Sequence, residues 1–264
     1  MVKPAARSKD LAKDLARAVK EANRQVYNNQ SLDQYDRNPS IFETGRQREI
    51  LEQLKTFGAE RPVRDVLDIG TGTGNILRLA RDLWPRTVGL DLGENLLAQL
   101  RARQSDLLLV AADGERLPFG AEAFDLVTLY GVLHHLLDPA PTFAEILRVL
   151  RPGGILYTDH DPNRFFGRFY RPFYLLAHRG RPGFASATED LAEFHHTRSP
   201  GLDPVRLTAA LRRLGFARAE YRLRITTNPE LPRAATGLLF LLRGAARLWP
   251  LKSFHTHFAL VARK

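Results

Sequence analysis

The run Val66-Leu67-Asp68-Ile69-Gly70-Thr71-Gly72-Thr73-Gly74 decides the fold of this chain. Three of its first four residues are apolar, three glycines follow within five positions, and residues 75–83 then carry an apolar pattern of helical period. This order predicts a buried strand, a glycine-rich turn and a helix. Glycine permits a positive φ in the turn and lets the backbone approach a ligand closely. Because a helix directs free N–H groups and its positive dipole end at the same point, we expect an anionic group such as a carboxylate to bind there.

Strands and helices are expected to alternate along the rest of the chain. Short apolar segments between turn residues indicate strands, and longer segments with apolar residues at three- and four-residue steps indicate helices. The expected strands cover residues 65–69, 87–91, 107–112, 124–130, 155–158, 217–224 and 256–262, and the expected helices cover residues 75–83, 94–103, 139–150 and 203–214. Regular alternation of this kind predicts an α/β fold whose parallel sheet has helices on both faces.

Two domains are expected from this pattern. Residues 1–30 and 40–57 each indicate a helix, so we expect residues 1–58 to form an N-terminal helical extension that acts as a lid. The remaining domain, residues 59–264, contains insertions at 162–202 and 225–253.

The two insertions carry unusual compositions. Residues 162–188 combine arginine and aromatic residues without any Asp or Glu, which favours an apolar lid with a positive rim over simple packing on the domain. Residues 236–252 combine leucine and tryptophan with arginine and lysine. That combination is typical of a helix in a membrane interface, and a pocket wall or a dimer contact are the alternatives.

Composition limits the function classes. The chain has 264 residues, of which 44% are hydrophobic and 26% charged, as in a globular protein. It has no cysteine, which excludes disulfides, thiolate metal sites and cysteine nucleophiles. No signal or transit peptide is evident, so we expect a cytoplasmic location. The net charge of +10 favours anionic partners, although a uniformly basic surface explains the total equally simply.

Asp91 ends the second expected strand, 21 residues after Gly70. A carboxylate at this position can accept hydrogen bonds from both hydroxyls of a ribose. An NAD(P) oxidoreductase shares this feature, but its glycines usually read G-x-G-x-x-G/A, whereas this turn reads G-x-G-x-G. The glycine spacing therefore disfavours a nicotinamide cofactor.

Six motifs in order give the chain a family resemblance. They are Val66–Gly74, Gly89-Leu90-Asp91-Leu92, Asp113-Gly114-Glu115-Arg116-Leu117-Pro118-Phe119, Phe124-Asp125-Leu126-Val127, Leu133-His134-His135 and Leu150-Arg151-Pro152-Gly153-Gly154. With them the sequence resembles the class I S-adenosylmethionine (SAM)-dependent methyltransferases over residues 60–160, and more loosely over the terminal strands. It is most similar to the broad group that includes ubiquinone/menaquinone-biosynthesis enzymes. The resemblance implies a Rossmann-like, mostly parallel seven-stranded sheet whose last strand is antiparallel.

The resemblance also implies roles for the cofactor-binding residues. The methionine part of SAM would be surrounded by Asp68, Gly70, Thr71, Gly72 and Gly74. Asp91 would bind the ribose hydroxyls, Leu92 and Gly114 would lie beside the adenine, and Asp113 would accept a hydrogen bond from its amino group. Tyr130 would line the pocket beneath the sulfonium. From the residues alone, Asp68 also fits a role in ordering the turn, and Asp113-Gly114 also fits a β-turn.

Methyl transfer requires an aligned acceptor, and an oxygen or carbon acceptor usually needs a base. The candidates at the carboxyl ends of strands are His134, His135, His160, Asp159 and Asp161. We expect His135 to be the base, followed by His160 and then His134; a packing role for the His134-His135 pair is the alternative. The pairs of histidine and carboxylate residues lack ligand spacing on a helix, so we expect no metal site.

The sequence thus predicts methyl transfer to an oxygen or carbon of a small, apolar, lipid- or quinone-like acceptor, with peripheral membrane association through residues 236–252. One alternative is an RNA methyltransferase, suggested by the charge and by the aromatic and arginine residues. Nucleic-acid substrates are disfavoured because the fourth strand ends in Leu129-Tyr130-Gly131 rather than an Asn/Asp-Pro-Pro-aromatic turn, and because cysteine is absent. A non-catalytic SAM-binding regulatory subunit is the other alternative.

Overall fold

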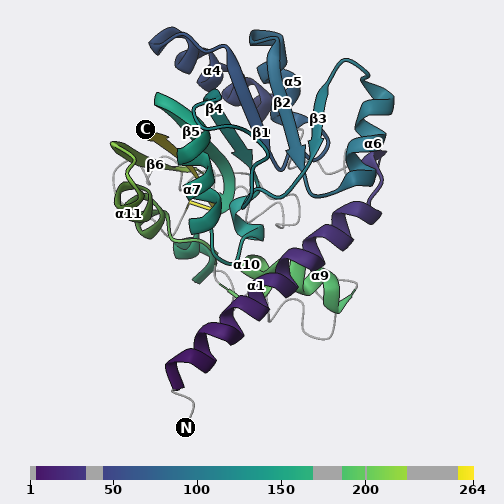
Figure 1. The fold of residues 1–264 in the computed structure, drawn as a ribbon, viewed down its shortest axis with the longest axis vertical. Coiled ribbons are helices and arrows are strands. Elements are labelled where there is room, and N and C mark those ends of the chain that lie inside the picture. The colour runs from purple at the N-terminus through teal and green to yellow at the C-terminus, as the bar shows by residue number, and fades with distance from the viewer. Residues whose placement is uncertain (1–3, 34–43, 169–185, 200, 225–254) are drawn as a thin grey trace, which may run out of the picture.

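The structure is a computed structural model, and it describes residues 4–33, 44–168, 186–199, 201–224 and 255–264 (Figure 1). The described residues form a seven-stranded sheet with the strand order β3-β2-β1-β4-β5-β7-β6. Its strands are β1 (Asp65–Ile69), β2 (Arg86–Asp91), β3 (Leu108–Ala111), β4 (Phe124–Tyr130), β5 (Leu150–Pro162), β6 (Arg218–Arg224) and β7 (His257–Arg263). Neighbouring strands from β3 to β5 are parallel, whereas β7 is antiparallel to both β5 and β6. The expected Rossmann-like, mostly parallel sheet with an antiparallel last strand is confirmed.

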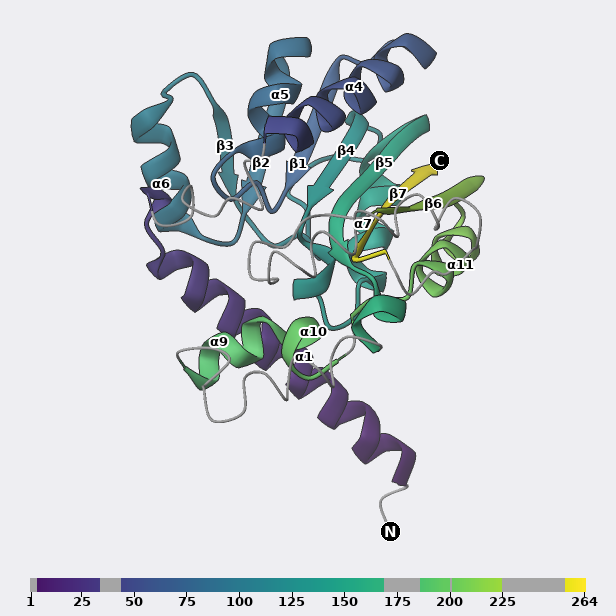
Figure 2. The same cartoon turned by 180° about the vertical axis from the view of Figure 1, so that it is seen from behind.

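Helices lie on both faces of this sheet (Figure 1, Figure 2). They are α4 (Thr44–Glu60), α5 (Asn75–Leu83), α6 (Glu94–Arg103), α7 (Ala140–Val149) and α11 (Pro204–Leu214). The α4 and α5 helices contact each other, and α7 contacts α11 on the opposite face. The α6 helix packs beside β3 at one edge of the sheet.

The alternation of side chains along the central strands explains this arrangement. Successive residues of a strand point to opposite faces, so each central strand supplies two cores. Val66, Leu126 and Ile155 belong to a fully buried cluster with Ile50 and Leu54 of α4. The residues that follow each of them belong to the cluster on the α7 face, together with side chains of that helix: Leu67, Val127, Leu156, Phe143 and Ile146. Both faces of the central sheet are therefore buried from solvent, as the near-continuous apolar strands predict.

The N-terminal helix lies apart from the two helical layers. Helix α1 (Pro4–Asn29) crosses the side of the molecule on which the parallel strands end, and its first turns project away from the body (Figure 2). It contacts α6 and α9 (Ala187–Ala192). The short α10 (Phe194–Thr197) follows α9 and contacts η1 (Leu133–His135), the 3-10 turn after β4.

The boundary between α7 and β5 is one that differs from the sequence prediction. A helix was expected to reach residue 150, with a Pro-Gly-Gly turn before a strand at residues 155–158, but β5 begins at Leu150. Leu150 pairs with Phe124, and the register then shifts before Leu126 pairs with Ile155. Gly153, with a φ of 72°, allows the chain to continue the strand through this irregularity instead of leaving it.

Most of the two unusual insertions, residues 169–185 and 225–254, lies outside the described residues. The expectations of an aromatic-rich lid and of a basic helix at 236–252 fall largely there. Among the residues that the structure describes, no helix is both long and apolar enough to cross a membrane.

Candidate functional site

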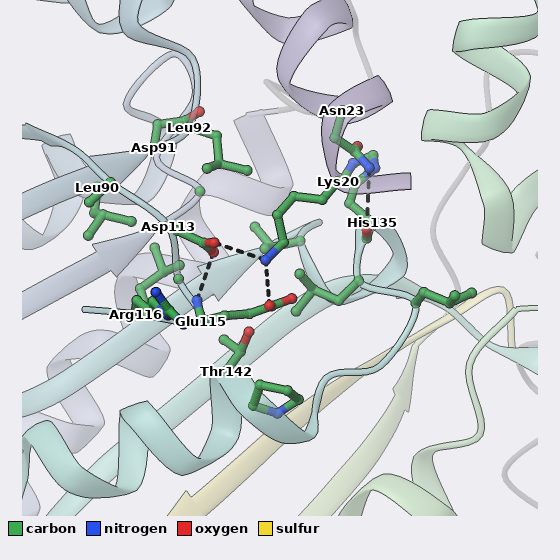
Figure 3. A pocket seen from close by; sticks show the side chains of 18 of the residues that line it. Lys20, Asn23, Leu90, Asp91, Leu92, Asp113, Glu115, Arg116, His135 and Thr142 are labelled. Atoms are coloured by element: carbon green, nitrogen blue, oxygen red, sulfur yellow. Dashed lines mark hydrogen bonds and ion pairs between the residues drawn. The ribbon is translucent and has the colours of Figure 1, made fainter. Parts of the chain in front are cut away.

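A cavity of about 910 Å³ lies where β1, β2 and β4 end, and α1 covers it (Figure 3). Predicted site residues that line it are Gly70, Gly72, Asp91, Leu92, Asp113, Gly114, Tyr130 and His135. The structure therefore brings eight predicted residues from four separate loops to one cavity. Five others lie outside its lining: Asp68, Thr71, Gly74, His134 and His160.

The glycine turn exposes bare backbone to this cavity. Gly70 has a φ of 67°, and a Cβ added to it would lie 2.4 Å from Cγ2 of Val132. No other residue type fits this position without displacing Val132. Gly72 has a φ of 51° and open space around the position of a Cβ. Helix α5 begins after Gly74 without a side-chain cap, and in its first turn the N–H of Leu77 is bonded to Asp68. The positive end of the helix dipole still suits an anion at this point.

Asp68 orders the turn from below. Its two carboxylate oxygens accept hydrogen bonds from the hydroxyls of Thr71 and Thr128, each at 2.7 Å. Burial raises the pKa of Asp68 to about 6, although these two hydrogen bonds oppose the shift. The geometry therefore matches the alternative in which Asp68 holds the turn, and it places Thr71 in the same supporting role.

Asp91 is held in place by the turn that it faces. Its Oδ2 accepts a hydrogen bond from the N–H of Gly72 at 2.8 Å, and its Oδ1 accepts one from the N–H of Gly93 at 2.8 Å. Burial raises the pKa of Asp91, and the backbone N–H groups oppose this shift. A carboxylate oxygen can accept more than one hydrogen bond, so both oxygens retain capacity for a pair of hydroxyls.

Asp113 carries a partner that the sequence did not reveal. Its Oδ1 accepts a hydrogen bond from the N–H of Glu115, and its Oδ2 lies 2.9 Å from Nζ of Lys20 on α1. Lys20 also forms an ion pair with Glu115 (Figure 3). Burial disfavours the charge of Lys20, but hydrogen bonds to Glu115 and Asp113 outweigh it and raise the pKa of Lys20. The first turn after β3 is thus tied to the N-terminal helix.

His135 lines the other end of the cavity. Its Nδ1 lies 3.2 Å from the carbonyl oxygen of Ala192, and its Nε2 lies 3.0 Å from the hydroxyl of Tyr27. The Tyr27 hydroxyl also lies 3.2 Å from Oε1 of Glu193, so its single proton is donated either to this carboxylate or to Nε2 of His135. A carbonyl oxygen only accepts hydrogen bonds, so Nδ1 of His135 carries a proton and Nε2 is the basic nitrogen of the neutral ring.

His134 is anchored below the same turn. Oδ1 of Asp161 lies 3.1 Å from both the backbone N–H and Nδ1 of His134. Asp161 is fully buried, and burial raises its pKa well above the usual range. The pairing fixes the His134 ring and the turn in which His135 stands.

His160 does not reach the cavity lining. It has a φ of 67°, and its ring stacks between Tyr130, at a centroid distance of 5.0 Å, and His257, at 4.6 Å. Asp159 beside it accepts hydrogen bonds from Arg46 and Tyr157 at 2.7 and 2.6 Å. Burial raises the pKa of Tyr130 to about 12, so its hydroxyl stays protonated.

Four polar residues beside the cavity lie outside the motifs by which the sequence predicts the site. Lys20, Asn23 and Tyr27 of α1 line the cavity, and Glu193 reaches its histidine end from the segment between α9 and α10. The three α1 residues are spaced by three and four positions, so they share one helix face. That polar face was the available signal, whereas nothing local distinguishes Glu193 from other surface acids.

Comparison with known proteins places this geometry in context. The model of a family described as a methyltransferase domain matches residues 67–158. Demethylmenaquinone methyltransferase of Thermus thermophilus is 30% identical over 148 residues, which cover 48% of this chain and 67% of that protein. Malonyl-[acyl-carrier protein] O-methyltransferase of Serratia marcescens is 34% identical over 110 residues, which cover 42% of this chain and 43% of that protein.

Solved structures show the same fold over a longer stretch. A SAM-dependent methyltransferase from Thermotoga maritima superposes with a TM-score of 0.56 and 17% identity, over 92% of this chain and 99% of that one. Four of the curated relatives are matched over only 39–64% of their own lengths.

Proposed function

Because the chain belongs to the class I SAM-dependent methyltransferase family, we propose that it transfers a methyl group from SAM to an oxygen or carbon of a small, apolar acceptor. The observation that carries the proposal is the single cavity that Asp91, the glycine turn and His135 line together. An adenosyl group held by Asp91 and an acceptor beside His135 would then share one cavity.

The residues at the strand ends fit the parts of SAM. The backbone at Gly70 and Gly72 and the uncapped start of α5 suit the cofactor's carboxylate, and Asp91, oriented by two backbone N–H groups, suits the ribose hydroxyls. Leu92, Asp113, Gly114 and Tyr130 line the cavity, so the first three could lie beside the adenine and Tyr130 could lie beneath the sulfonium. SAM supplies an electrophilic methyl group: the S–CH₃ bond breaks as the bond to the acceptor forms, and its electron pair stays on sulfur.

At the acceptor end, His135 is the residue that we propose activates the acceptor. Its Nε2 is the basic nitrogen, and it faces the hydroxyl of Tyr27 in the cavity wall. His134 and Asp161 hold the turn that carries His135, so His134 is a positioning residue. His160 stacks on Tyr130 outside the cavity lining, which supports a role in positioning Tyr130 rather than in catalysis.

The acceptor class rests on the cavity and on the relatives. Apolar residues close to His135 in the chain, Val132, Leu136 and Leu137, contribute to the cavity wall, which suits an apolar acceptor. One relative is named a demethylmenaquinone methyltransferase, another a C-methyltransferase of ubiquinone/menaquinone biosynthesis, and a third a malonyl-[acyl-carrier protein] O-methyltransferase. We favour a quinone- or lipid-like molecule, which α1 would cover as a lid.

Calorimetric titration with SAM and S-adenosylhomocysteine tests the cofactor assignment. We expect binding by the wild type and a loss of at least about tenfold in Asp91→Asn, which removes the negative charge that hydrogen-bonds the ribose. Asp82→Asn, in an exposed side chain of α5, is the matched control and should bind as the wild type does. Equal affinity of Asp91→Asn and wild type would overturn the assignment, provided that both variants melt like the parent.

Methyl transfer is tested with labelled SAM against a panel of reduced quinones, acyl thioesters and RNA. We expect incorporation into a quinone or a thioester. Labelling of RNA alone would replace the proposed acceptor with a nucleic acid. SAM binding without labelling of any acceptor, including cell lipid extracts, would favour the non-catalytic subunit instead.

A further inference from the structure

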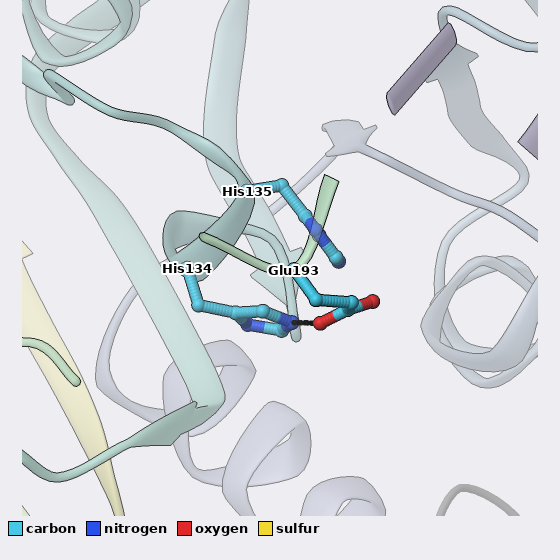
Figure 4. Close-up of side chains that lie close together, drawn as sticks. All are labelled: His134, His135 and Glu193. Atoms are coloured by element: carbon cyan, nitrogen blue, oxygen red, sulfur yellow. Dashed lines mark ion pairs between the residues drawn. The ribbon is translucent and has the colours of Figure 1, made fainter. Parts of the chain in front are cut away.

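Three side chains that can bind metal ions converge beside the cavity. His134 and His135 come from the turn after β4, and Glu193 comes from the segment between α9 and α10 (Figure 4). Among the described residues, these three each offer a ligand atom that lies within 4.8 Å of the other two. This cluster overturns the expectation that ligand spacing along a helix would reveal any metal site, because Glu193 lies 58 residues after His135 in the chain.

Hydrogen bonds on the far side of both rings select the atoms that point into this cluster. Nδ1 of His135 donates to the carbonyl of Ala192 at 3.2 Å. Oδ1 of Asp161 accepts the backbone N–H of His134 and lies 3.1 Å from Nδ1 of that ring, so an ionised Asp161 accepts a hydrogen bond from Nδ1 as well. In each neutral ring the lone pair is therefore on Nε2. Histidines that bind metals usually donate their other N–H to a carboxylate or a carbonyl in this way.

The distances are close to those of a metal site. Nε2 of His134 lies 3.9 Å from Oε2 of Glu193. Ligands about 2.1 Å from a tetrahedral ion lie about 3.4 Å from each other, so the observed pair needs to close by less than an ångström. Glu193 has 21% of its side chain exposed, which leaves it room to make that movement.

We propose that His134, His135 and Glu193 bind a divalent transition-metal ion such as Zn²⁺ or Mn²⁺. Two imidazoles and one carboxylate suit such ions and leave coordination positions open. Because His135 and Tyr27 line the cavity, an ion held by the cluster would lie beside the proposed acceptor. This use of the ion rests on the proposed function: a cation there would lower the pKa of an acceptor hydroxyl, whose proton would pass to solvent. His135 would then hold the ion through Nε2, and the ion would replace that nitrogen as the group that activates the acceptor.

Two members of the cluster, His135 and Glu193, also suit a different occupant, a proton shared between them through Tyr27. The Tyr27 hydroxyl lies 3.0 Å from Nε2 of His135 and 3.2 Å from Oε1 of Glu193. An ion at the cluster takes the place of that proton, with the Tyr27 hydroxyl as a further ligand or beside the ion. Metal titration separates the two occupants directly.

The test uses the full chain without a histidine tag, treated with a chelator and titrated with Zn²⁺ and Co²⁺. We expect one ion per chain by calorimetry and a visible absorption band of four- or five-coordinate cobalt. Glu193→Gln and His134→Asn should weaken binding by about 10–100-fold or more. His160→Asn, a histidine outside the cluster, is the matched control and should bind metal as the wild type does.

No binding by folded wild-type protein, or equal binding by wild type and Glu193→Gln, would overturn the proposal. Circular dichroism and SAM titration of each variant separate these outcomes from misfolding. If SAM binding and methyl transfer remain intact without metal, the ion has no part in the reaction and the proposed function stands. If the protein binds metal but transfers a methyl group to no acceptor, the metal site stands and the proposed function is refuted.

Discussion

Replacing Gly70 with alanine tests how the glycine turn is built. The added Cβ would lie 2.4 Å from Cγ2 of Val132, and the residue keeps a φ of 67°. An alanine in the left-handed region costs about 1–2 kcal/mol. Overpacking against Val132 adds about 1–3 kcal/mol. We therefore expect Gly70→Ala to lower the free energy of unfolding by about 2–5 kcal/mol.

Gly72→Ala is the matched control for this prediction. It has a φ of 51°, but the nearest atom to the added Cβ is 4.0 Å away, so only the backbone strain of about 1–2 kcal/mol applies. In a chain of this size each kcal/mol shifts the melting temperature by about 2–4 °C. Urea unfolding followed by circular dichroism would resolve the difference between the two variants.

A second substitution isolates the steric contribution. Val132→Ala removes Cγ2, so Gly70→Ala should cost about 1–3 kcal/mol less in the Val132→Ala background than in the wild type. Strain from the positive φ remains in both backgrounds. If Gly70→Ala is no more destabilising than Gly72→Ala, or if Val132→Ala brings no recovery, the turn is not limited by contact with Val132.

Three further predictions concern charge and proton position around the cavity. Burial raises the pKa of Asp68 to about 6, so the folded state binds more protons than the unfolded state between about pH 4 and 6. The stability of the wild type relative to Asp68→Asn should therefore be greatest below pH 4 and fall by up to about 3 kcal/mol as the pH rises through 6. Urea unfolding at several pH values measures this difference, and a difference that stays constant with pH would contradict the raised pKa. Lys20→Met should tighten SAM binding by about 1.5–5-fold, because it frees the carboxylate oxygen of Asp113 that Lys20 now pairs with. The control Lys55→Met breaks an exposed ion pair with Glu52 and should leave the affinity for SAM unchanged. Weaker SAM binding by Lys20→Met would mean that Lys20 itself contacts the cofactor. The Tyr27 hydroxyl contacts His135 and Glu193, so Tyr27→Phe should lower kcat at least about tenfold and leave the dissociation constant of SAM within twofold. Steady-state kinetics and calorimetry measure the two quantities. An unchanged kcat would show that the Tyr27 hydroxyl has no part in activating the acceptor.

The part of the site that could be predicted is the part built from local signals. The run of Val66 to Gly74 determines its strand, turn and helix from local sequence alone. Asp91 ends β2 and Asp113 follows β3, and parallel strands bring their carboxyl ends to one edge of the sheet. Lys20, Tyr27 and Glu193 could not be placed in this way. Their positions depend on how α1 and α9 dock across that edge, which is determined by side-chain packing between segments far apart in the sequence.

The different positions of His135 and His160 relative to the cavity have a comparable cause. Both histidines follow parallel strands, so the sequence alone makes each a candidate over the cavity. In a regular strand Asp161 would point to the same face as Asp159. The pairing of β5 with β7 is instead irregular between Thr158 and Asp161, and His160 takes a φ of 67° within that irregularity.

The consequence is that the two aspartates serve different partners. Asp159 pairs with Arg46, while Asp161 turns to His134 and anchors the loop that carries His135. His160, between them, is directed to the stack with Tyr130 and His257. Bulges of this kind redirect side chains near functional sites, and here one bulge both withdraws His160 from the cavity and provides the support on which His135 depends. Straightening it would therefore impair the acceptor end of the site even though no residue of the bulge lines the cavity.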